Sequence, residues 1–279
     1  MNILSLFDGI SAAQVALNRA NIHYDNYFAS EIDRFTIAVT QHHYPNTIQL
    51  GNVLDIDFTT LPKIDILLGG SPCQGFSSAG LLKGFDDPRS QLFFKYVEVL
   101  EMLQPKYFLY ENVKNTNAVK NTMTESFGRP PIEINSNLVS AQNRKRLYWT
   151  NIPNVSQPQD KGIILQDILE TDEDVLDKSR LNKTPWRANL FQDARKQYLN
   201  CTRKPKSNTV VCWKFSRDCQ GYLEYKDFIR AFTPLECERL QTFEDNYTNV
   251  VNTSTTQRYK MIGNSWTVDV IKHLLENIK

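Results

Sequence analysis

The chain has 279 residues, of which 41% are hydrophobic and 23% are charged, and its formal net charge is +1 at pH 7. This composition is that of a globular protein with room for one sizeable domain and a smaller one, and the total charge gives no sign of an acidic partner. No apolar run approaches the roughly 18 residues of a membrane span, and the opening MNILSLFDG predicts a strand and a turn instead of a signal peptide.

The first part of the chain alternates short apolar runs with helical patterns. Ile3–Phe7 predicts a buried strand that ends in the turn Asp8-Gly9, and small apolar residues recur at helical spacing from Ala13 to Ala20. The same reading predicts further strands at 27–30, 64–68 and 107–110 and an amphipathic helix at 92–103. This alternation predicts an α/β fold with a mostly parallel sheet.

Four candidate site residues fall at the ends of these predicted strands: Asp8, Glu31, Cys73 and Glu111. A sheet of this class binds ligands beyond the carboxyl ends of its strands, so we expect the four side chains at one edge. Cys73, in the run GGSPCQGFSSAG (69–80), has two interpretations. A lone cysteine is most often a small buried hydrophobe, whereas a thiol on a loop after a strand can be a nucleophile.

A cofactor is indicated by two residues near the start of the chain. Gly9 lies between the first predicted strand and helix, where a glycine lets a ligand approach the backbone. Glu31 follows it by 22 residues, which is the spacing of the acid that binds ribose hydroxyls in Rossmann-like folds. Together they predict an adenosine-containing cofactor. A nucleoside triphosphate is disfavoured, because the sequence contains neither GxGxxG nor a phosphate-binding GxxxxGK motif.

Charge is distributed unevenly in the second half of the chain. Residues 167–177 contain six acids and no base, whereas residues 178–217 contain eleven bases and one acid, a net +10 (11 − 1). A run of charge is usually a solvated face. Here aromatic residues are interleaved with the bases, which favours contacts with nucleic acid. Two of these aromatics, Trp186 and Trp213, fit a domain core and a base-stacking platform equally well.

Regular structure is expected again from about residue 228. TPLE at 233–236 is a capping box that predicts a helix through Phe243, and GNSWTVDVIKHLLENI predicts a turn and a last helix. We expect this last part to pack back on the first. The predicted catalytic and cofactor-binding domain is therefore discontinuous (1–152 and 226–279), with a small target-recognition domain inserted at 153–225.

No metal site is expected. The five cysteines form no CxxC pair and have no histidine at zinc-finger spacing, which suits a reducing cytosol. The cysteines other than Cys73 are interpreted as packing residues, and His42-His43 as surface residues.

The motifs taken together resemble the cytosine-C5 DNA methyltransferases over nearly the whole chain. The landmarks are FDGIS (7–11), EID (31–33), SPCQ (71–74), LFF (92–94), ENV (111–113), QNRKR (142–146), RAFTPLECERLQTF (230–243) and GNSWTVDVI (263–271). The resemblance implies a Rossmann-like sheet that binds S-adenosylmethionine, the product S-adenosylhomocysteine, double-stranded DNA as partner and no metal or membrane. It is closest to small phage or bacterial enzymes, with some likeness to the eukaryotic de novo enzymes. The resemblance also implies a monomer that acts in the cytoplasm of a bacterial or phage-infected cell. A separate restriction endonuclease in the same system is an optional partner.

The resemblance also implies catalytic roles. Cys73 is similar to the nucleophile that adds to C6 of the target cytosine, and Glu111 to the acid at N3. Arg146 is similar to the arginine at O2 of the base, with Arg144 beside it, and Gln142 completes the same motif. Transient covalent addition is what an unreactive pyrimidine carbon needs. The base must leave the duplex to be reached, at a cost of a few kcal/mol.

The remaining implied contacts fall into two sets. The cofactor set is Phe7, Asp8, Gly9, Ile10, Glu31, Ile32, Asn52, Val53, Leu92, Asn264, Ser265 and Trp266. The DNA set is Gln74, Ser77 and Ser78, in a loop (74–90) that resembles a lid, and Arg203, Lys204, Lys206, Lys214 and Arg217 in the basic segment.

Two departures and two alternatives remain. Ser11 replaces the usual second glycine of the first motif, and Asn52 replaces a common aspartate, although an amide still offers an acceptor to an amino group. A tRNA-methylating branch of the fold carries Cys-Phe-Thr, which Asn200-Cys201-Thr202 does not reproduce. A DNA-binding module without activity would not need Cys73, Glu111 and the QNRKR motif together.

Overall fold

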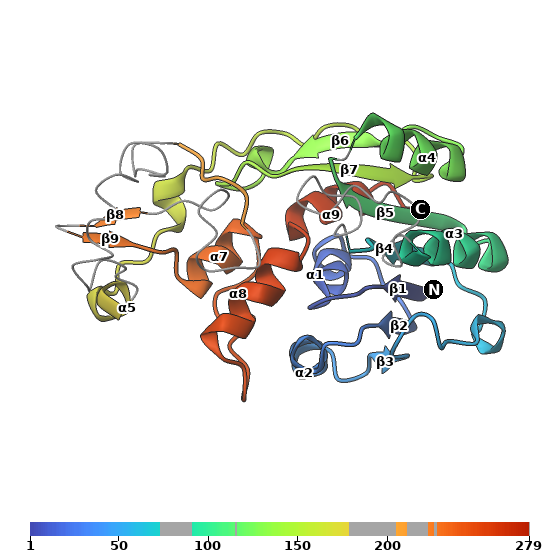
Figure 1. The fold of residues 1–279 in the computed structure, drawn as a ribbon, viewed down its shortest axis with the longest axis horizontal. Coiled ribbons are helices and arrows are strands. Elements are labelled where there is room, and N and C mark those ends of the chain that lie inside the picture. Colours follow the sequence, from blue (N-terminus) through green and yellow to red (C-terminus); the bar gives the residue numbers. More distant parts are fainter. Residues whose placement is uncertain (73–90, 115, 179–204, 211–222, 226–227, 279) are drawn as a thin grey trace. The chain divides into compact units, whose positions relative to one another are not determined.

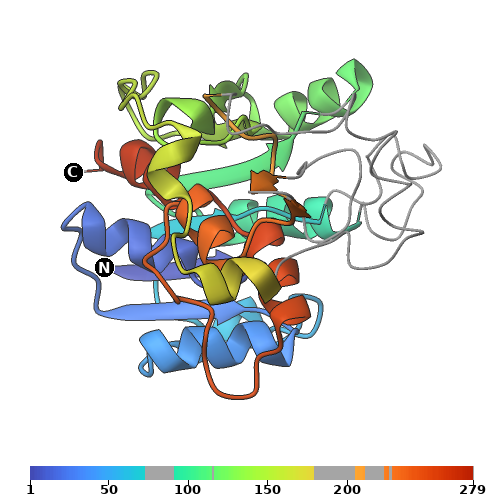
Figure 2. The ribbon, with the colours of Figure 1, turned by 90° about the vertical axis from the view of Figure 1, so that its left-hand side faces the viewer.

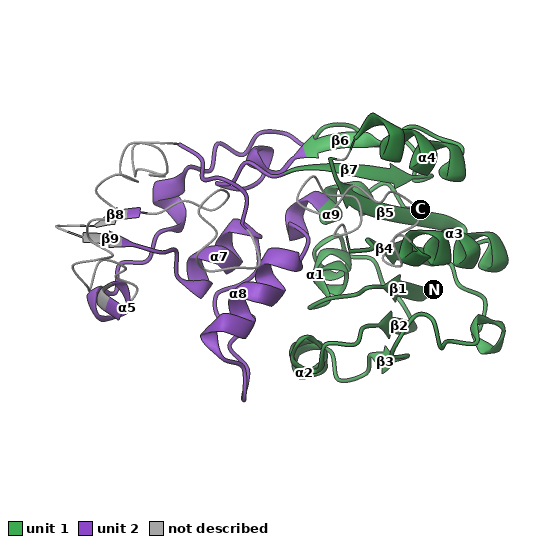
Figure 3. Cartoon of the chain, viewed as in Figure 1, with its two compact units in different colours: residues 1–134, 145–157, 271–279 green, residues 135–144, 158–270 purple. Residues whose placement is uncertain are grey.

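The computed structural model describes residues 1–72, 91–114, 116–178, 205–210, 223–225 and 228–278. The chain forms two compact units (Figure 3). Unit 1 consists of Met1–Ile134, Lys145–Gln157 and Ile271–Lys279, and unit 2 consists of Asn135–Arg144 and Pro158–Val270. This division differs from the predicted one, which grouped residues 135–144 and 226–270 with the catalytic domain.

Unit 1 is built on a seven-stranded sheet. In space the strands follow the order β3-β2-β1-β4-β5-β7-β6, which Figures 1 and 2 show rising from the blue N-terminal strands to the green ones. The pairs from β3 to β5 are parallel and β5 pairs antiparallel with β7, which confirms the predicted α/β fold with a mostly parallel sheet. The strands are β1 (Asn2–Leu6), β2 (Asn26–Ser30), β3 (Ile48–Gln49), β4 (Ile66–Gly69), β5 (Tyr107–Val113), β6 (Ile132–Asn135) and β7 (Lys145–Thr150).

Local signals explain where the helices of unit 1 begin and end. These helices are α1 (Ala12–Arg19), α2 (Arg34–His43), α3 (Gln91–Leu103) and α4 (Asn117–Phe127), with a 3-10 turn at Phe58–Thr60. Asp33 caps α2 by accepting from the backbone N–H of Phe35, and α4 ends at Gly128, whose φ of 63° favours glycine. Apolar side chains of α3 and α4 cover one face of the sheet in a single core with alternate residues of β1, β4 and β5.

Unit 2 has its own apolar core, and that core explains its extent. It joins Leu165 and Val210 of the predicted recognition region to Phe232, Leu240 and Ile262 of the later helices, so the two regions fold together. The predicted capping box is confirmed, although its helix ends at Leu240 instead of Phe243. The elements are α5 (Glu173–Lys178), β8 (Leu223–Tyr225), β9 (Phe228–Arg230), α7 (Pro234–Leu240) and α8 (Thr255–Asn264), with 3-10 turns at Ser136–Leu138 and Leu165–Ile168; α9 (Val268–Leu275) crosses into unit 1.

Among the described segments, no helix combines the length and the apolar character that crossing a membrane requires. Cys237 is buried in the unit 2 core without a disulfide, as expected of a packing residue.

Candidate active site

The turn after β1 has an unusual backbone. Phe7, Gly9 and Ser11 all have positive φ, at 59°, 62° and 55°. For Phe7 and Ser11 this conformation is strained, and such strain is typical of functional sites. A Cβ added at Gly9 would meet no atom within 4 Å, so there is open space beside this backbone. The turn can therefore accommodate a ligand close to its main chain.

Asp8 lies within this turn, and its carboxyl is held by neighbouring hydroxyl groups. The hydroxyl of Tyr27 donates to Oδ1 at 2.6 Å, and Ser11 Oγ donates to Oδ2. Burial raises the pKa of the Asp8 carboxyl to about 6, against these hydrogen bonds, which lower it. Asp8 is thus a carboxyl that titrates close to neutral pH at the edge of the sheet.

Glu31 connects the end of β2 to the same turn. Its Oε2 accepts from the backbone N–H of Gly9 at 3.0 Å, and its Oε1 accepts from Ile32 and Asp33 at 2.7 and 2.9 Å. These bonds fix the direction of the carboxylate beyond the strand. The neighbouring Ile32 is 74% exposed, which leaves an apolar side chain available next to the carboxylate.

Asn52 and Val53 lie on the segment that follows β3. Ser30 Oγ donates to the carbonyl of Gly51 at 2.8 Å, which attaches this segment to the end of β2. Val53 is buried in the core of unit 1. Asn52 donates from Nδ2 to Asp55 at 3.0 Å, while its Oδ1 accepts weakly from Leu54 at 3.3 Å. The amide is therefore oriented with its oxygen as an acceptor. Asn52 needs this orientation if it is to take the place of the aspartate that is common at this position.

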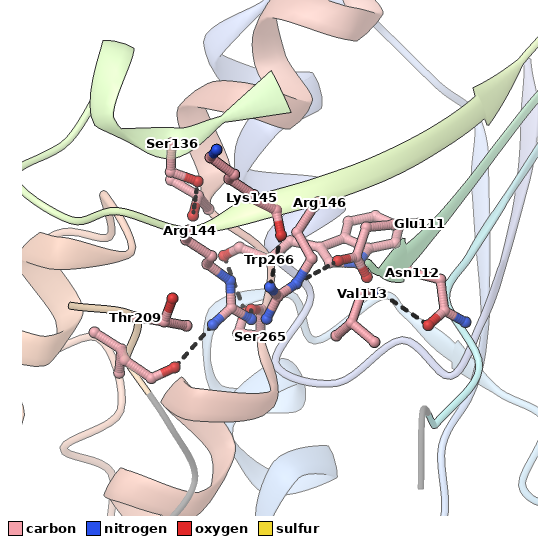
Figure 4. A network of polar contacts seen from close by, with 12 residues as sticks. Glu111, Asn112, Val113, Ser136, Arg144, Lys145, Arg146, Thr209, Ser265 and Trp266 are labelled. Atoms are coloured by element: carbon pink, nitrogen blue, oxygen red, sulfur yellow. Dashed lines mark hydrogen bonds and ion pairs between the residues drawn. The ribbon is translucent and has the colours of Figure 1, made fainter. Parts of the chain in front are cut away.

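The ends of β5 and β7 bring Glu111 and Arg146 together. Arg146 Nε lies 2.9 Å from Glu111 Oε1, and the two side chains are only 14% and 12% exposed (Figure 4). Arg146 is paired in register with Val113, so it is the diagonal cross-strand neighbour of Glu111 on the same face. Sequence reasoning named both residues, and the antiparallel pairing explains why they meet.

Most of these features sit at or just beyond the carboxyl ends of parallel strands, which is where the sequence predicts a site, and Arg146 joins them from the first residues of the antiparallel strand β7. The profile of the C-5 cytosine-specific DNA methylase family matches residues 1–185 and 184–279, which is the whole chain. The chain belongs to the C-5 cytosine-specific DNA methylase family.

Individual relatives support this assignment. Orphan methyltransferase M.Rho11sI of Bacillus phage rho11s is 36% identical over 64% of the chain, but this match covers only 36% of that protein, so the chain spans about a third of its length. Type II methyltransferase M.SsoII of Shigella sonnei is 30% identical over 99% of the chain and 79% of its own. The fold is similar to a crystal structure of Spodoptera frugiperda DNMT2, with a TM-score of 0.78 and 22% identity over 99% and 98% of the two chains.

Other residues that the family resemblance names lie elsewhere. Arg144 and Gln142 are buried inside unit 2, with 4% and 0% exposure. Arg144 donates to the carbonyls of Val210, Gly263 and Ser265 at 2.8, 3.3 and 2.9 Å (Figure 4). Gln142 accepts from the N–H of Val210 at 3.1 Å. In the structure both side chains hold backbone segments, and the catalytic roles that the resemblance implies for them stay predictions.

The predicted cofactor-binding residues include two further groups. Leu92 is half-buried against the core of unit 1, at the start of α3. Asn264 ends α8, and Ser265 and Trp266 follow it in unit 2. Gln241 Nε2 donates to the carbonyls of Ile262 and Ser265 at 3.0 and 3.1 Å. The backbone is therefore held both in the last turn of α8 and just after the helix ends.

The predicted DNA contacts are described at one position. Lys206 donates from Nζ to the carbonyls of Asn137, Ser140 and Ile163, at 2.7, 3.2 and 2.6 Å. An ammonium group has three protons, so these bonds use its donor capacity inside unit 2. We therefore omit Lys206 from the proposed phosphate contacts. Cys73, Gln74, Ser77, Ser78, Arg203, Lys204, Lys214 and Arg217 lie outside the described residues.

Two polar residues near the site were not predicted from the sequence. Ser71 and Tyr110 are both buried, and their hydroxyl oxygens are 2.6 Å apart. The signal was present, since Ser71 belongs to SPCQ and Tyr110 directly precedes ENV. Within the described part of the chain, no group of three or more His, Cys, Asp or Glu side chains could hold a metal ion.

Proposed function

We propose that this protein transfers a methyl group from S-adenosylmethionine to C5 of a cytosine in a specific sequence of double-stranded DNA. The observation that carries the proposal is the Glu111–Arg146 pair at the end of β5. It lies on the strand next to β4, whose continuation is Ser71-Pro72-Cys73, in a chain that matches the methylase family from end to end. Acid, arginine and thiol are the groups that cytosine methylation at C5 requires.

The cofactor would be held by the edge of unit 1. The carboxylate of Glu31 is directed by three backbone N–H groups and can bind ribose hydroxyls. Ile32 offers an exposed apolar surface for adenine, and Asn52 offers an acceptor for its amino group. Asp8 supplies negative charge close to the open backbone at Gly9, which suits the cationic methionine part. S-adenosylmethionine supplies an electrophilic methyl group when it is bound.

In the proposed reaction the cytosine is flipped out of the duplex, at a cost of a few kcal/mol. The Cys73 thiolate forms a bond to C6 while Glu111 holds a proton at N3, which places an electron pair on C5. C5 takes the methyl group, whose bond to the sulfonium sulfur breaks, so that S-adenosylhomocysteine is left. Loss of the C5 proton to a base then restores the double bond, and Cys73 leaves C6 as a thiolate. Arg146 contributes by orienting Glu111 and by contacting O2 of the base.

The DNA partner and the setting follow from the same proposal. The basic segment 178–217, with Arg203, Lys204, Lys214 and Arg217, would contact phosphates, and Gln74, Ser77 and Ser78 would contact the flipped nucleotide. The phage origin of M.Rho11sI supports a phage or bacterial enzyme. We propose a monomer that acts in the cytoplasm of a bacterial or phage-infected cell, with or without a cognate endonuclease.

Labelled S-adenosylmethionine and two nucleic acids test the proposal. We expect label in duplex DNA, recovered as 5-methylcytosine, and none with Cys73→Ser. A duplex that contains 5-fluorocytosine should trap the protein covalently, because the C5 substituent cannot leave as a proton. Label in tRNA and not in DNA would refute DNA as substrate, and label in neither would favour a binding module.

A further inference from the structure

A buried polar network joins the ends of β4 and β5. The hydroxyl oxygens of Ser71 and Tyr110 are 2.6 Å apart, and Asn112 Nδ2 donates to the Tyr110 hydroxyl at 3.1 Å. Asn112 in turn accepts from the backbone N–H of Val113 at 2.8 Å. All three side chains are buried. The network therefore links the residue two positions before Cys73 to the two residues that flank Glu111.

The geometry of β5 separates this network from the acid. Side chains alternate along a strand, so Tyr110 and Asn112 point to one face of the sheet and Glu111 to the other. On that other face, Glu111 pairs with Arg146 of β7. The end of β5 is thus fixed from both faces, by an ion pair on one and by a hydroxyl network on the other.

The Tyr110 ring has little freedom to move. Phe93, Tyr96 and Phe127 surround it with ring centroids 5.6, 4.8 and 5.2 Å away. Burial raises the pKa of the Tyr110 hydroxyl to about 12, so the group keeps its proton at neutral pH. Since it accepts from Asn112, it can donate that proton to Ser71. A rigid ring therefore presents a permanent hydroxyl to the segment that leads to Cys73.

We infer that Tyr110 is a positioning residue, whose hydroxyl holds the start of the Cys73 segment against the strand that carries Glu111. This inference rests on the proposed function, because it assigns the nucleophile to Cys73 and the acid to Glu111. Covalent addition needs both groups at the same pyrimidine ring, so a small displacement between the ends of β4 and β5 slows it. Binding of S-adenosylmethionine uses other residues and does not depend on the network.

The experiment measures how fast the protein forms a covalent adduct with a 5-fluorocytosine duplex in the presence of S-adenosylmethionine. Tyr110→Phe removes only the hydroxyl, and Ser71→Ala removes its partner. The matched control is Tyr96→Phe, which removes an equally buried hydroxyl that donates to the carbonyls of Leu67 and Leu109 instead. Affinity for S-adenosylmethionine, measured by calorimetry, and the unfolding midpoint show whether each variant is intact.

We expect Tyr110→Phe and Ser71→Ala each to slow adduct formation about tenfold, with unchanged affinity for S-adenosylmethionine. The double variant should be no slower than either single one, because both remove the same contact. Tyr96→Phe should react at about the wild-type rate. The inference is overturned if Tyr110→Phe is no slower than Tyr96→Phe, or if the two single effects multiply in the double variant. If the wild-type protein forms no adduct, the proposed function fails as well.

Discussion

Asp8 makes the stability of this protein depend on pH in an unusual direction. Its carboxyl has a pKa of about 6 in the folded chain, raised from 3.8 by burial. The folded state therefore holds this proton more tightly than the unfolded state, and the contribution of Asp8 to stability is greatest below pH 3.8. Stability is lost as the pH rises through 6, where the folded protein must bury a charge.

The shift gives the size of the effect. A difference of about two pKa units corresponds to about 3 kcal/mol, and two-state linkage places about 2 kcal/mol of it between pH 4.5 and 7. Asp8→Asn is the matched variant, because an amide of the same shape can accept from Tyr27 and donate to Ser11 but does not titrate in this range.

The assay is urea unfolding of both proteins from pH 4.5 to 8. We expect the free energy of unfolding of the wild type, taken relative to Asp8→Asn, to fall by about 2 kcal/mol as the pH rises to 7. Other carboxyl groups titrate in both proteins, so the difference isolates Asp8. A difference that stays flat, or that rises with pH, would refute a buried carboxyl with a raised pKa.

Two further predictions, the second with a control variant, test how the two units are built. Gly69→Ala should destabilise the protein by about 1–3 kcal/mol in thermal unfolding. The new methyl group would lie 2.8 Å from the Tyr96 ring and 2.9 Å from the carbonyl oxygen of Leu6. A variant as stable as the wild type would contradict this close approach. Lys206→Met should lose about 1–3 kcal/mol of stability and leave the salt dependence of DNA binding unchanged, whereas Lys204→Met should keep stability and lower the salt slope by about one unit. The reverse pattern would return Lys206 to the phosphate contacts.

The sequence was sufficient for the central strands and for part of the site. Apolar runs that end in a polar residue, as at Asp8 and Glu31, indicate both a buried strand and its functional end. The capping box at Thr233 was visible because it depends on three neighbouring residues. β7 was not predicted, because it begins with the charged pair Lys145-Arg146. Its apolar residues Leu147 and Trp149 pack into a core that distant segments of the chain form.

The roles of Arg144 and Lys206 could not be predicted for a different reason. A count of charges treats every lysine and arginine as a surface group, which holds for most of them. These two instead donate to backbone carbonyls of distant segments. The partners of Arg144 are 66 to 121 residues away in the sequence, and those of Lys206 are 43 to 69 residues away. Such partners are defined only once the core of unit 2 has formed, since neighbouring residues give no sign of them.

Ser11 shows how a departure from a family motif can be compensated locally. Its φ of 55° is one that a glycine adopts without strain, which accounts for the usual glycine at this position. The serine instead uses its hydroxyl, which donates to Asp8 and accepts from Gln14 at 3.1 Å. Gln14 is held in turn by Thr47 and Tyr24. The strained backbone and the buried carboxyl are therefore parts of one network, so the departure at Ser11 preserves the turn and places Asp8 within it.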